Sequence, residues 1–302
     1  MAVYSTAESI KIHRIPDSER GPGFQQWMTN ELRAGYGFIE RQMNLCRRFW
    51  KWEAVFLVYA LVNAVSIGYI VPGMVMMQGM AMPSKAEIDH MVMYLLIGSL
   101  MWGFLSVVFD EVSNTITWER WEGTIEYTFM APVGRFTHLI GICLYSIVYS
   151  LLRTALVLIL VSAFFNIDMS SADYLSGAAV LIASSFAFVG LGIVASVLPL
   201  ISPEKGSHVA RIIQALLLMI SGIYYPVDVL PEWIQWLSRF SPATYALDGI
   251  RKALLEGCGL AQVAESLICL MLSAIVLIPF GLAVFSIAEE YARRTGLLKR
   301  NG

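Results

Sequence analysis

A run of glutamates is the first feature of this chain whose residue types and spacing point to a chemical role. Residues 118–129 read WERWEGTIEYTF, and Glu119, Glu122 and Glu126 recur there at intervals of three and four. In a helix this spacing places the three carboxylates on one face. The apolar residues at similar spacing form a second stripe: Trp118, Trp121, Ile125 and Phe129. We therefore predict one amphipathic helix over 118–129, ended by the APVGR sequence that follows it.

The chain shows no sequence motif of catalysis or of metal binding. Its four histidines are unpaired at ligand spacing, and the sequence contains no HExxH, GxSxG or GxxxxGK[ST] pattern. The four cysteines form no CxxC pair, so neither a disulfide framework nor a metal site is predicted. No long basic run suggests nucleic acid as a partner. An integral membrane enzyme is therefore poorly supported, and we expect no cofactor bound by the chain itself.

The composition is that of an integral membrane protein. Of 302 residues, 57% are hydrophobic and only 15% are charged, whereas a soluble domain carries about a quarter of charged residues. A helix needs about 20 apolar residues to cross a bilayer. Six segments are candidates: Ala54–Met77, Met91–Phe109, Leu139–Phe165, Tyr174–Leu200, Val209–Tyr225 and Ala264–Ala288. The fifth is the weakest because its uninterrupted apolar part is short. We predict an all-α protein with six transmembrane helices.

The basic residues predict the orientation of these helices. Sixteen of the 21 lysines and arginines lie in the N-terminal segment, in the 115–138 and 201–211 loops and in the C-terminal tail, and four lie on the opposite side. Basic residues concentrate on the cytoplasmic side of membrane proteins. Both termini are therefore expected in the cytoplasm, with the chain in the cell (inner) membrane.

Two segments are predicted before the first span. Residues 1–30 form an N-terminal cytoplasmic segment to which the sequence assigns no role. Residues 31–51 form a basic amphipathic helix with aromatic side chains, which suits the anionic surface of the inner leaflet. The alternative is a charged flank that only enforces the topology.

The negative charge of the 118–129 helix predicts a different environment. Orientation places this helix in the first cytoplasmic loop, where an acidic face would be repelled by the anionic lipid surface. We expect it to dock on another protein that offers a basic or apolar groove. The alternative is an interfacial helix that only connects spans two and three.

A second unusual segment lies on the external side, over residues 226–257. It predicts two short helices in a hairpin at the membrane surface, the first beginning at Pro231 and the second opened by Ser241 and Pro242 and ended by Gly257. The predicted apolar faces are Leu230, Trp233, Ile234, Leu237 and Phe240 in the first helix, and Leu247, Ile250 and Leu254 in the second. The alternative is a packed extracellular loop.

Arg153 lies near the middle of the third span, where an arginine usually faces protein or water. The nearest acidic residues, Asp110, Glu111 and Glu289, lie at cytoplasmic ends of spans and are expected at the wrong depth to meet it. One hypothesis is that Arg153 lines a transport path and binds an anionic substrate group. The alternative is a structural arginine bonded to carbonyls or hydroxyls of neighbouring spans.

The two unusual segments resemble those of one family. ERWEGTIEYTFMAPVGRFTHLIG resembles the stretch after the second span of type-2 ABC exporter permeases, and SGIYYPVDVLPEWIQWLSRFSPATYALDGIR resembles that family's signature near the fifth span. Both occur in the family's order and topological positions. The resemblance therefore covers residues 31–300 as an ABC-2 type transmembrane domain.

The resemblance implies roles for particular residues. The coupling helix that docks on a cytoplasmic ATPase would include Trp118, Glu119, Arg120, Trp121, Glu122, Gly123 and Glu126. The external gate hairpin would include Tyr224, Tyr225, Pro226, Leu230, Pro231, Trp233, Pro242 and Tyr245. Arg153 would be a candidate residue of the substrate path.

The resemblance also implies partners. Two permease subunits, expected to be a homodimer, would form the path among membrane lipids, and two copies of a separate ATPase would bind ATP and Mg²⁺. The expected substrate is a small amphiphile such as a drug or lipid. The alternatives are export of a polysaccharide or lipid-linked glycan, a secondary transporter without an ATPase, and an assembly or sensory subunit that shares the fold.

Overall fold

The computed structural model describes residues 24–78, 84–131, 133–165, 172–202 and 205–296, and within these ranges every regular element is a helix. The helices are α1 (Phe24–Arg48), α2 (Trp50–Gly68), α3 (Ile70–Gln78), α4 (Lys85–Ser113), α5 (Thr115–Trp121), α6 (Ile125–Met130), α7 (Arg135–Phe165), α8 (Tyr174–Ile201), α9 (Gly206–Ile220), the 3₁₀ turn η2 (Val227–Val229), α10 (Glu232–Ser238), α11 (Pro242–Leu255) and α12 (Ala264–Thr295). The prediction of an all-α membrane protein is confirmed.

Five segments of the described chain are long and apolar enough to cross a membrane: Trp50–Met76, Glu87–Ser113, Phe136–Phe165, Tyr174–Ile201 and Ala264–Thr295. The fifth predicted span is the shorter helix α9. Its 15 residues rise about 22 Å, less than the roughly 30 Å of a bilayer core. The helix ends at Ser221, and Gly222 then adopts a φ of 71°. This left-handed residue turns the chain toward the hairpin.

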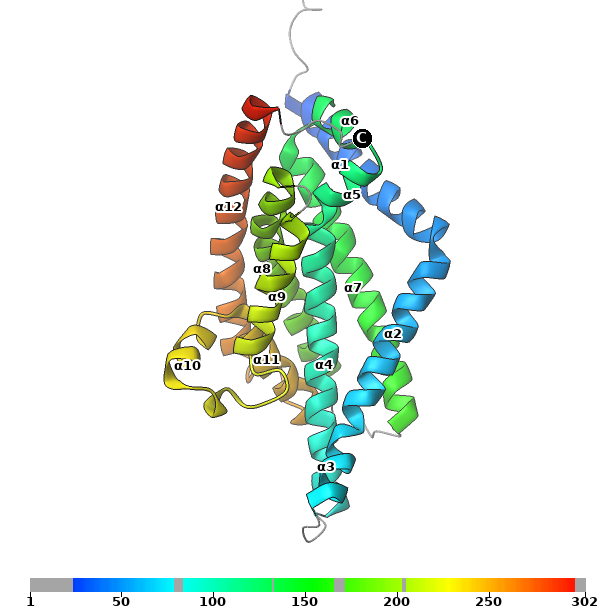
Figure 1. The fold of residues 1–302 in the computed structure, drawn as a ribbon, viewed down its shortest axis with the longest axis vertical. Helices are drawn as coiled ribbons and strands as arrows, with labels where there is room; N and C mark the ends of the chain where they lie inside the picture. Colours follow the sequence, from blue (N-terminus) through cyan, green and yellow to red (C-terminus); the bar gives the residue numbers. More distant parts are fainter. Residues whose placement is uncertain (1–23, 79–83, 132, 166–171, 203–204, 297–302) are drawn as a thin grey trace, which may run out of the picture.

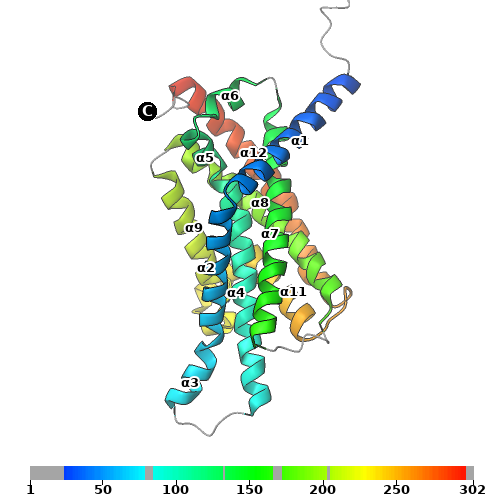
Figure 2. The same cartoon turned by 90° about the vertical axis from the view of Figure 1, so that its right-hand side faces the viewer.

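The first span is broken into α2 and α3 at Tyr69. Pro72 explains the break, because a proline has no N–H to donate and its ring clashes with the carbonyl four residues earlier, here that of Gly68. The chain consequently bends as it approaches the lower end of the molecule in Figure 2.

The long helices are arranged around α8, which contacts α4, α9, α11 and α12 (Figure 1). One end of the bundle carries α1, α5, α6 and the last turns of α12, and we call it the α5 end. The opposite part carries α3, the hairpin helix α10 and the first turns of α12. The two segments that the sequence singled out are therefore far apart along the bundle.

Helices α8 and α12 approach very closely at two glycines. A β-carbon at Gly190 would lie 2.7 Å from the Leu277 Cβ, and one at Gly281 would lie 3.0 Å from the Gly190 carbonyl oxygen. Small residues allow the backbones of membrane helices to touch in this way. This crossing fixes the C-terminal span against the centre of the bundle.

A helix occupies the stretch predicted as the N-terminal interfacial helix, but it begins at Phe24, within the stretch assigned to the N-terminal segment, and ends at Arg48. Residues 1–23 lie outside the described residues. Helix α1 crosses the α5 end obliquely and packs on α7 (Figure 2). The Glu31 carboxylate accepts a hydrogen bond from the backbone N–H of Gly134 at 3.1 Å. Helix α1 therefore contacts the bundle along one side and exposes apolar residues such as Leu32 and Tyr36 on another.

The hairpin predicted for the external side contains both predicted helices. Pro242 opens α11 and Gly257, with a φ of 64°, follows it. The predicted face of α11 is buried at Leu247, Ile250 and Leu254. Ser241 stands at the N-cap position but its side chain does not cap the helix. Its Oγ lies 3.0 Å from that of Ser221, which ties the hairpin to the end of α9.

The predicted apolar face of the first hairpin helix is not a buried face. Of that stripe only Ile234 of α10 is buried. Trp233 of the same helix is exposed, and so is Phe240, which follows the helix. The helix has only seven residues, and it contacts α9 and η2 but no long span extensively. Its remaining aromatic residues are therefore left on the surface of this subunit.

Candidate functional site: the α5–α6 turn and the adjoining cavity

The helix predicted over 118–129 is two short helices, α5 and α6, joined at residues 122–124. Gly123 adopts a φ of 70°, a left-handed conformation that glycine adopts without steric cost. The prediction of one continuous helix was wrong because it treated this glycine as an ordinary helical residue. The bend separates the predicted apolar stripe, so that Trp118 and Trp121 are exposed while Ile125 is completely buried.

Glu119 is the centre of a buried polar network, and its side chain is only 3% exposed. Its Oε1 lies 2.8 Å from the His138 Nε2, 3.3 Å from the Arg41 Nη1 and 3.4 Å from the Thr128 Oγ1. The Arg41 Nη2 also donates to the Glu122 carboxylate at 2.6 Å. One carboxylate thus connects α5 to α1, α6 and α7.

These contacts change the interpretation of the acidic face. The sequence suggested that its basic counterpart belongs to another protein. For Glu119 and Glu122 the basic group is Arg41 of the same chain. The side chain of Glu126 lies outside the described residues. The carboxylates of Glu119 and Glu122 therefore hold the turn in place from within.

Arg120 forms the connection to the central helix. Its Nη2 donates a hydrogen bond to the Leu200 carbonyl oxygen of α8 at 3.0 Å, and the residue is buried. Burial of the guanidinium lowers the pKa of Arg120 from its usual value. The α5–α6 turn is therefore attached to the ends of α1, α7 and α8.

Four large side chains are exposed on this turn, and we call them the coupling surface. They are Trp118, Trp121, Tyr127 and Met130, which are 60%, 81%, 79% and 82% exposed. The two tryptophan rings pack edge to face with centroids 6.0 Å apart. Aromatic residues and methionine are enriched in the cores of protein interfaces.

The sequence prediction missed Tyr127 and Met130. On one continuous helix they fall outside the apolar stripe, and they join the tryptophans only because the chain bends at Gly123. Recognising Gly123 as a helix terminator would have identified them. Of the predicted coupling residues, Trp118 and Trp121 lie on this surface, Glu122 lies beside it with its side chain 32% exposed, and Glu119 and Arg120 lie beneath it.

Two of the residues that the sequence assigned to an external gate bond to backbone carbonyls. The Tyr225 hydroxyl donates to the Met219 carbonyl at 2.6 Å, and the Tyr245 hydroxyl donates to that of Arg239 at 2.8 Å. Pro226 and Pro231 flank the 3₁₀ turn η2 and α10. The gate role of this hairpin stays a prediction.

Arg251 of α11 contacts both the start of the hairpin and helix α4. Its guanidinium donates to the carbonyl oxygens of Gly222 and Ile223, at 3.3 and 2.8 Å, and lies 3.7 Å from the ring centroid of Tyr94. A β-carbon at Gly98 would lie 2.4 Å from the Ile223 oxygen. Movement of α4 would therefore be transmitted directly to the turn that begins the hairpin.

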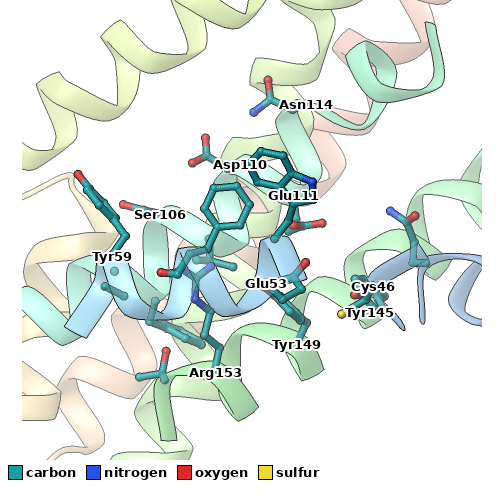
Figure 3. A pocket seen from close by; sticks show the side chains of 18 of the residues that line it. Cys46, Glu53, Tyr59, Ser106, Asp110, Glu111, Asn114, Tyr145, Tyr149 and Arg153 are labelled. Atoms are coloured by element: carbon teal, nitrogen blue, oxygen red, sulfur yellow. The ribbon is translucent and has the colours of Figure 1, made fainter. Parts of the chain in front are cut away.

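A cavity of about 1090 Å³ lies beside the α5–α6 turn, between α1, α2, α4, α7 and α9. Figure 3 shows Glu53, Glu111, Tyr149 and Arg153 around it. The Tyr149 hydroxyl donates to the Glu53 carboxylate, and the Arg153 Nη2 donates to the Phe56 carbonyl at 3.0 Å. Arg153 thus makes the carbonyl contact of a structural arginine and also lines the cavity.

The expectation that the acidic residues lie at the wrong depth to meet Arg153 is corrected by this arrangement, because Glu111 lines the same cavity as Arg153. Asp110 also lines it, beside Gln214 and Arg211 of α9. Neither carboxylate forms an ion pair with the basic residues of α1, within the residues that the structure describes.

Comparison with known families agrees with this architecture. The profile described as ABC-2 type transporter matches residues 38–255, which extend from α1 through α11 and include both the α5–α6 turn and the hairpin. Comparison with individual curated proteins found no match. The matched segment covers more than two thirds of the chain. The chain therefore belongs to the ABC-2 type transporter family and is a multi-pass transmembrane component of such a transporter.

Proposed function

We propose that this chain is the permease subunit of an ATP-driven exporter whose ATPase is a separate polypeptide that docks on the coupling surface. The observation that carries the proposal is the exposure of Trp118, Trp121, Tyr127 and Met130 on a turn that is otherwise firmly anchored. A contiguous exposed group of large apolar side chains is typical of an interaction site. ATP and Mg²⁺ would be bound by the docked ATPase, on the cytoplasmic side.

The anchoring of the turn supports a mechanical role. A partner that pushes the coupling surface acts on Glu119 and Arg120 directly beneath it, and these residues contact α1, α7 and α8. Packed helices transmit displacement as rigid elements. In this proposal, ATP binding and hydrolysis would shift α7 and α8 relative to the other spans.

The complete path would require a second copy of the chain. Helix α9 supports this part of the proposal, because Ile212, Leu216 and Met219 along it are exposed and uncovered by other described helices. The substrate would be an amphiphile, since the adjoining cavity combines aromatic walls with charged groups. The orientation, with the α5 end in the cytoplasm, rests on the distribution of basic residues.

A Trp121→Ala substitution tests ATPase docking. The chain would be co-expressed with a candidate cytoplasmic ABC ATPase from the same genome, and the complex purified through a tag on the permease. Aromatic residues at interface centres contribute about 2 kcal/mol or more to binding, so the variant should retain roughly one thirtieth of the affinity for the ATPase.

The matched control is Trp236→Ala, which removes another exposed tryptophan, 59% exposed, from the hairpin helix α10. It should bind the ATPase as the wild type does. Equal retention of the ATPase by both variants would show that docking occurs elsewhere. ATP-independent transport by the purified chain alone would instead favour a secondary transporter.

A further inference from the structure

The acidic and basic side chains that line the cavity beside α5 do not all have direct partners. Three arginines line it, and each already has a partner. Arg41 binds Glu119 and Glu122, Arg153 donates to the Phe56 carbonyl, and Arg211 lies beside Asp110.

One carboxylate in the same wall forms no direct hydrogen bond or ion pair with a described residue. Glu111 lines the cavity from the last turn of α4, within electrostatic range of the Arg153 guanidinium and of the Glu53 and Asp110 carboxylates. Two other acidic residues of the cavity do have hydrogen-bond partners. The Glu53 carboxylate accepts from the Tyr149 hydroxyl, and the Asp110 carboxylate accepts from Gln214. An ionised carboxylate that is withdrawn from bulk water and left without a direct partner is unfavourable, and either a proton or a bound cation can neutralise it.

Aromatic side chains from several helices line the same cavity as this carboxylate. Phe56 and Tyr59 of α2, Trp102 of α4 and Tyr149 of α7 line the cavity with it. The faces of such rings attract cations, most strongly where water is excluded. A site that combines aromatic walls with one carboxylate outside any direct ion pair suits an organic cation better than a metal ion, which would require several oxygen ligands.

We propose that this cavity binds amphiphilic organic cations, with Glu111 as the counter-ion and Phe56, Tyr59 and Trp102 as the aromatic walls. The inference deepens the proposed function, on which it rests for the idea that the bound molecule is transported. Binding itself requires only this chain. Helices α1 and α5 contribute to the cavity lining, so the cavity reaches the α5 end.

Two ions of nearly identical shape and opposite charge test the proposal. Tetraphenylphosphonium is the cation and tetraphenylborate the anion, and binding of each to the purified full chain in detergent would be measured by equilibrium dialysis. We expect the cation to bind at least about tenfold more tightly than the anion. Glu111→Gln should weaken cation binding about tenfold, because it removes the charge while keeping the shape.

Glu290→Gln is the matched control, since Glu290 is an exposed carboxylate of α12 that pairs with Arg294 and does not line the cavity. It should leave the affinity for the cation unchanged. A gel-filtration profile identical to that of the wild type would establish that each variant is folded.

Two results would overturn the proposal. One is equal cation affinity in Glu111→Gln and the wild type. The other is tighter binding of tetraphenylborate that is lost in Arg153→Gln, which would assign the cavity to anionic substrates instead. Because no ATPase takes part in the measurement, failure here leaves the docking proposal standing, and failure of docking leaves cation binding measurable.

Discussion

Replacing Glu119 with alanine should lower the free energy of unfolding by about 3 kcal/mol and detach the α5–α6 turn from the bundle. The substitution removes the shared partner of Arg41, His138 and Thr128. His138 is itself buried, so its ring nitrogen would lose its hydrogen bond in a place that water does not readily reach. The measurement is thermal unfolding of the purified chain in detergent, followed by tryptophan fluorescence.

Glu122→Ala provides the comparison, because Glu122 binds the same arginine from a position about one third exposed. Ion pairs in such positions contribute at most about 1 kcal/mol. If the two alanine variants unfold at the same temperature, the buried network around Glu119 does not anchor the turn. Glu119→Gln should fall between them, because an amide can still accept a hydrogen bond from Thr128.

Gly190→Val should destabilise the chain by about 3 kcal/mol through overpacking, and we expect much of the protein to misassemble in the membrane. A β-carbon at this position would lie 2.7 Å from the Leu277 Cβ and 2.9 Å from the Leu277 carbonyl carbon. The second contact is with backbone, so no rotamer change relieves it. The observable results are a lower yield of monodisperse protein and a lower unfolding temperature.

Gly103→Val is the matched substitution in another span, because a β-carbon at Gly103 has no neighbouring atom within 4 Å. It should change the free energy of unfolding by less than about 1 kcal/mol. Equal stability of the two valine variants would mean that α8 and α12 do not cross as closely as described.

The helical spans were predictable because long apolar runs have few alternatives in a membrane. Five of the six predicted segments are long and apolar enough to span, and the remaining one, Val209–Tyr225, was predicted as the weakest. The break in the 118–129 segment was not predicted, because side-chain periodicity contains no information about a residue with positive φ. Gly123 could have adopted either conformation, and the contacts of Glu119 and Arg120 with three other helices determine the outcome.

The composition of the cavity could not be predicted for a different reason. The depth of Arg153 was judged by counting from the end of its own span, as though all spans began at one level. Helix α7 extends beyond the start of α2 because it packs against α1. The middle of α7 is therefore level with the first turns of α2, as the bond from Arg153 to the Phe56 carbonyl shows.

The most direct test of the account is photo-crosslinking from the coupling surface. A photoreactive phenylalanine derivative would replace Tyr127, which is 79% exposed at the α5 end, and separately Trp236 at the hairpin. After irradiation of the complex purified with its ATPase, we predict a crosslink to the ATPase from position 127 and none from position 236. A crosslink from position 236 alone, in a complex that hydrolyses ATP, would contradict the assignment of the α5–α6 turn as the site of ATPase coupling.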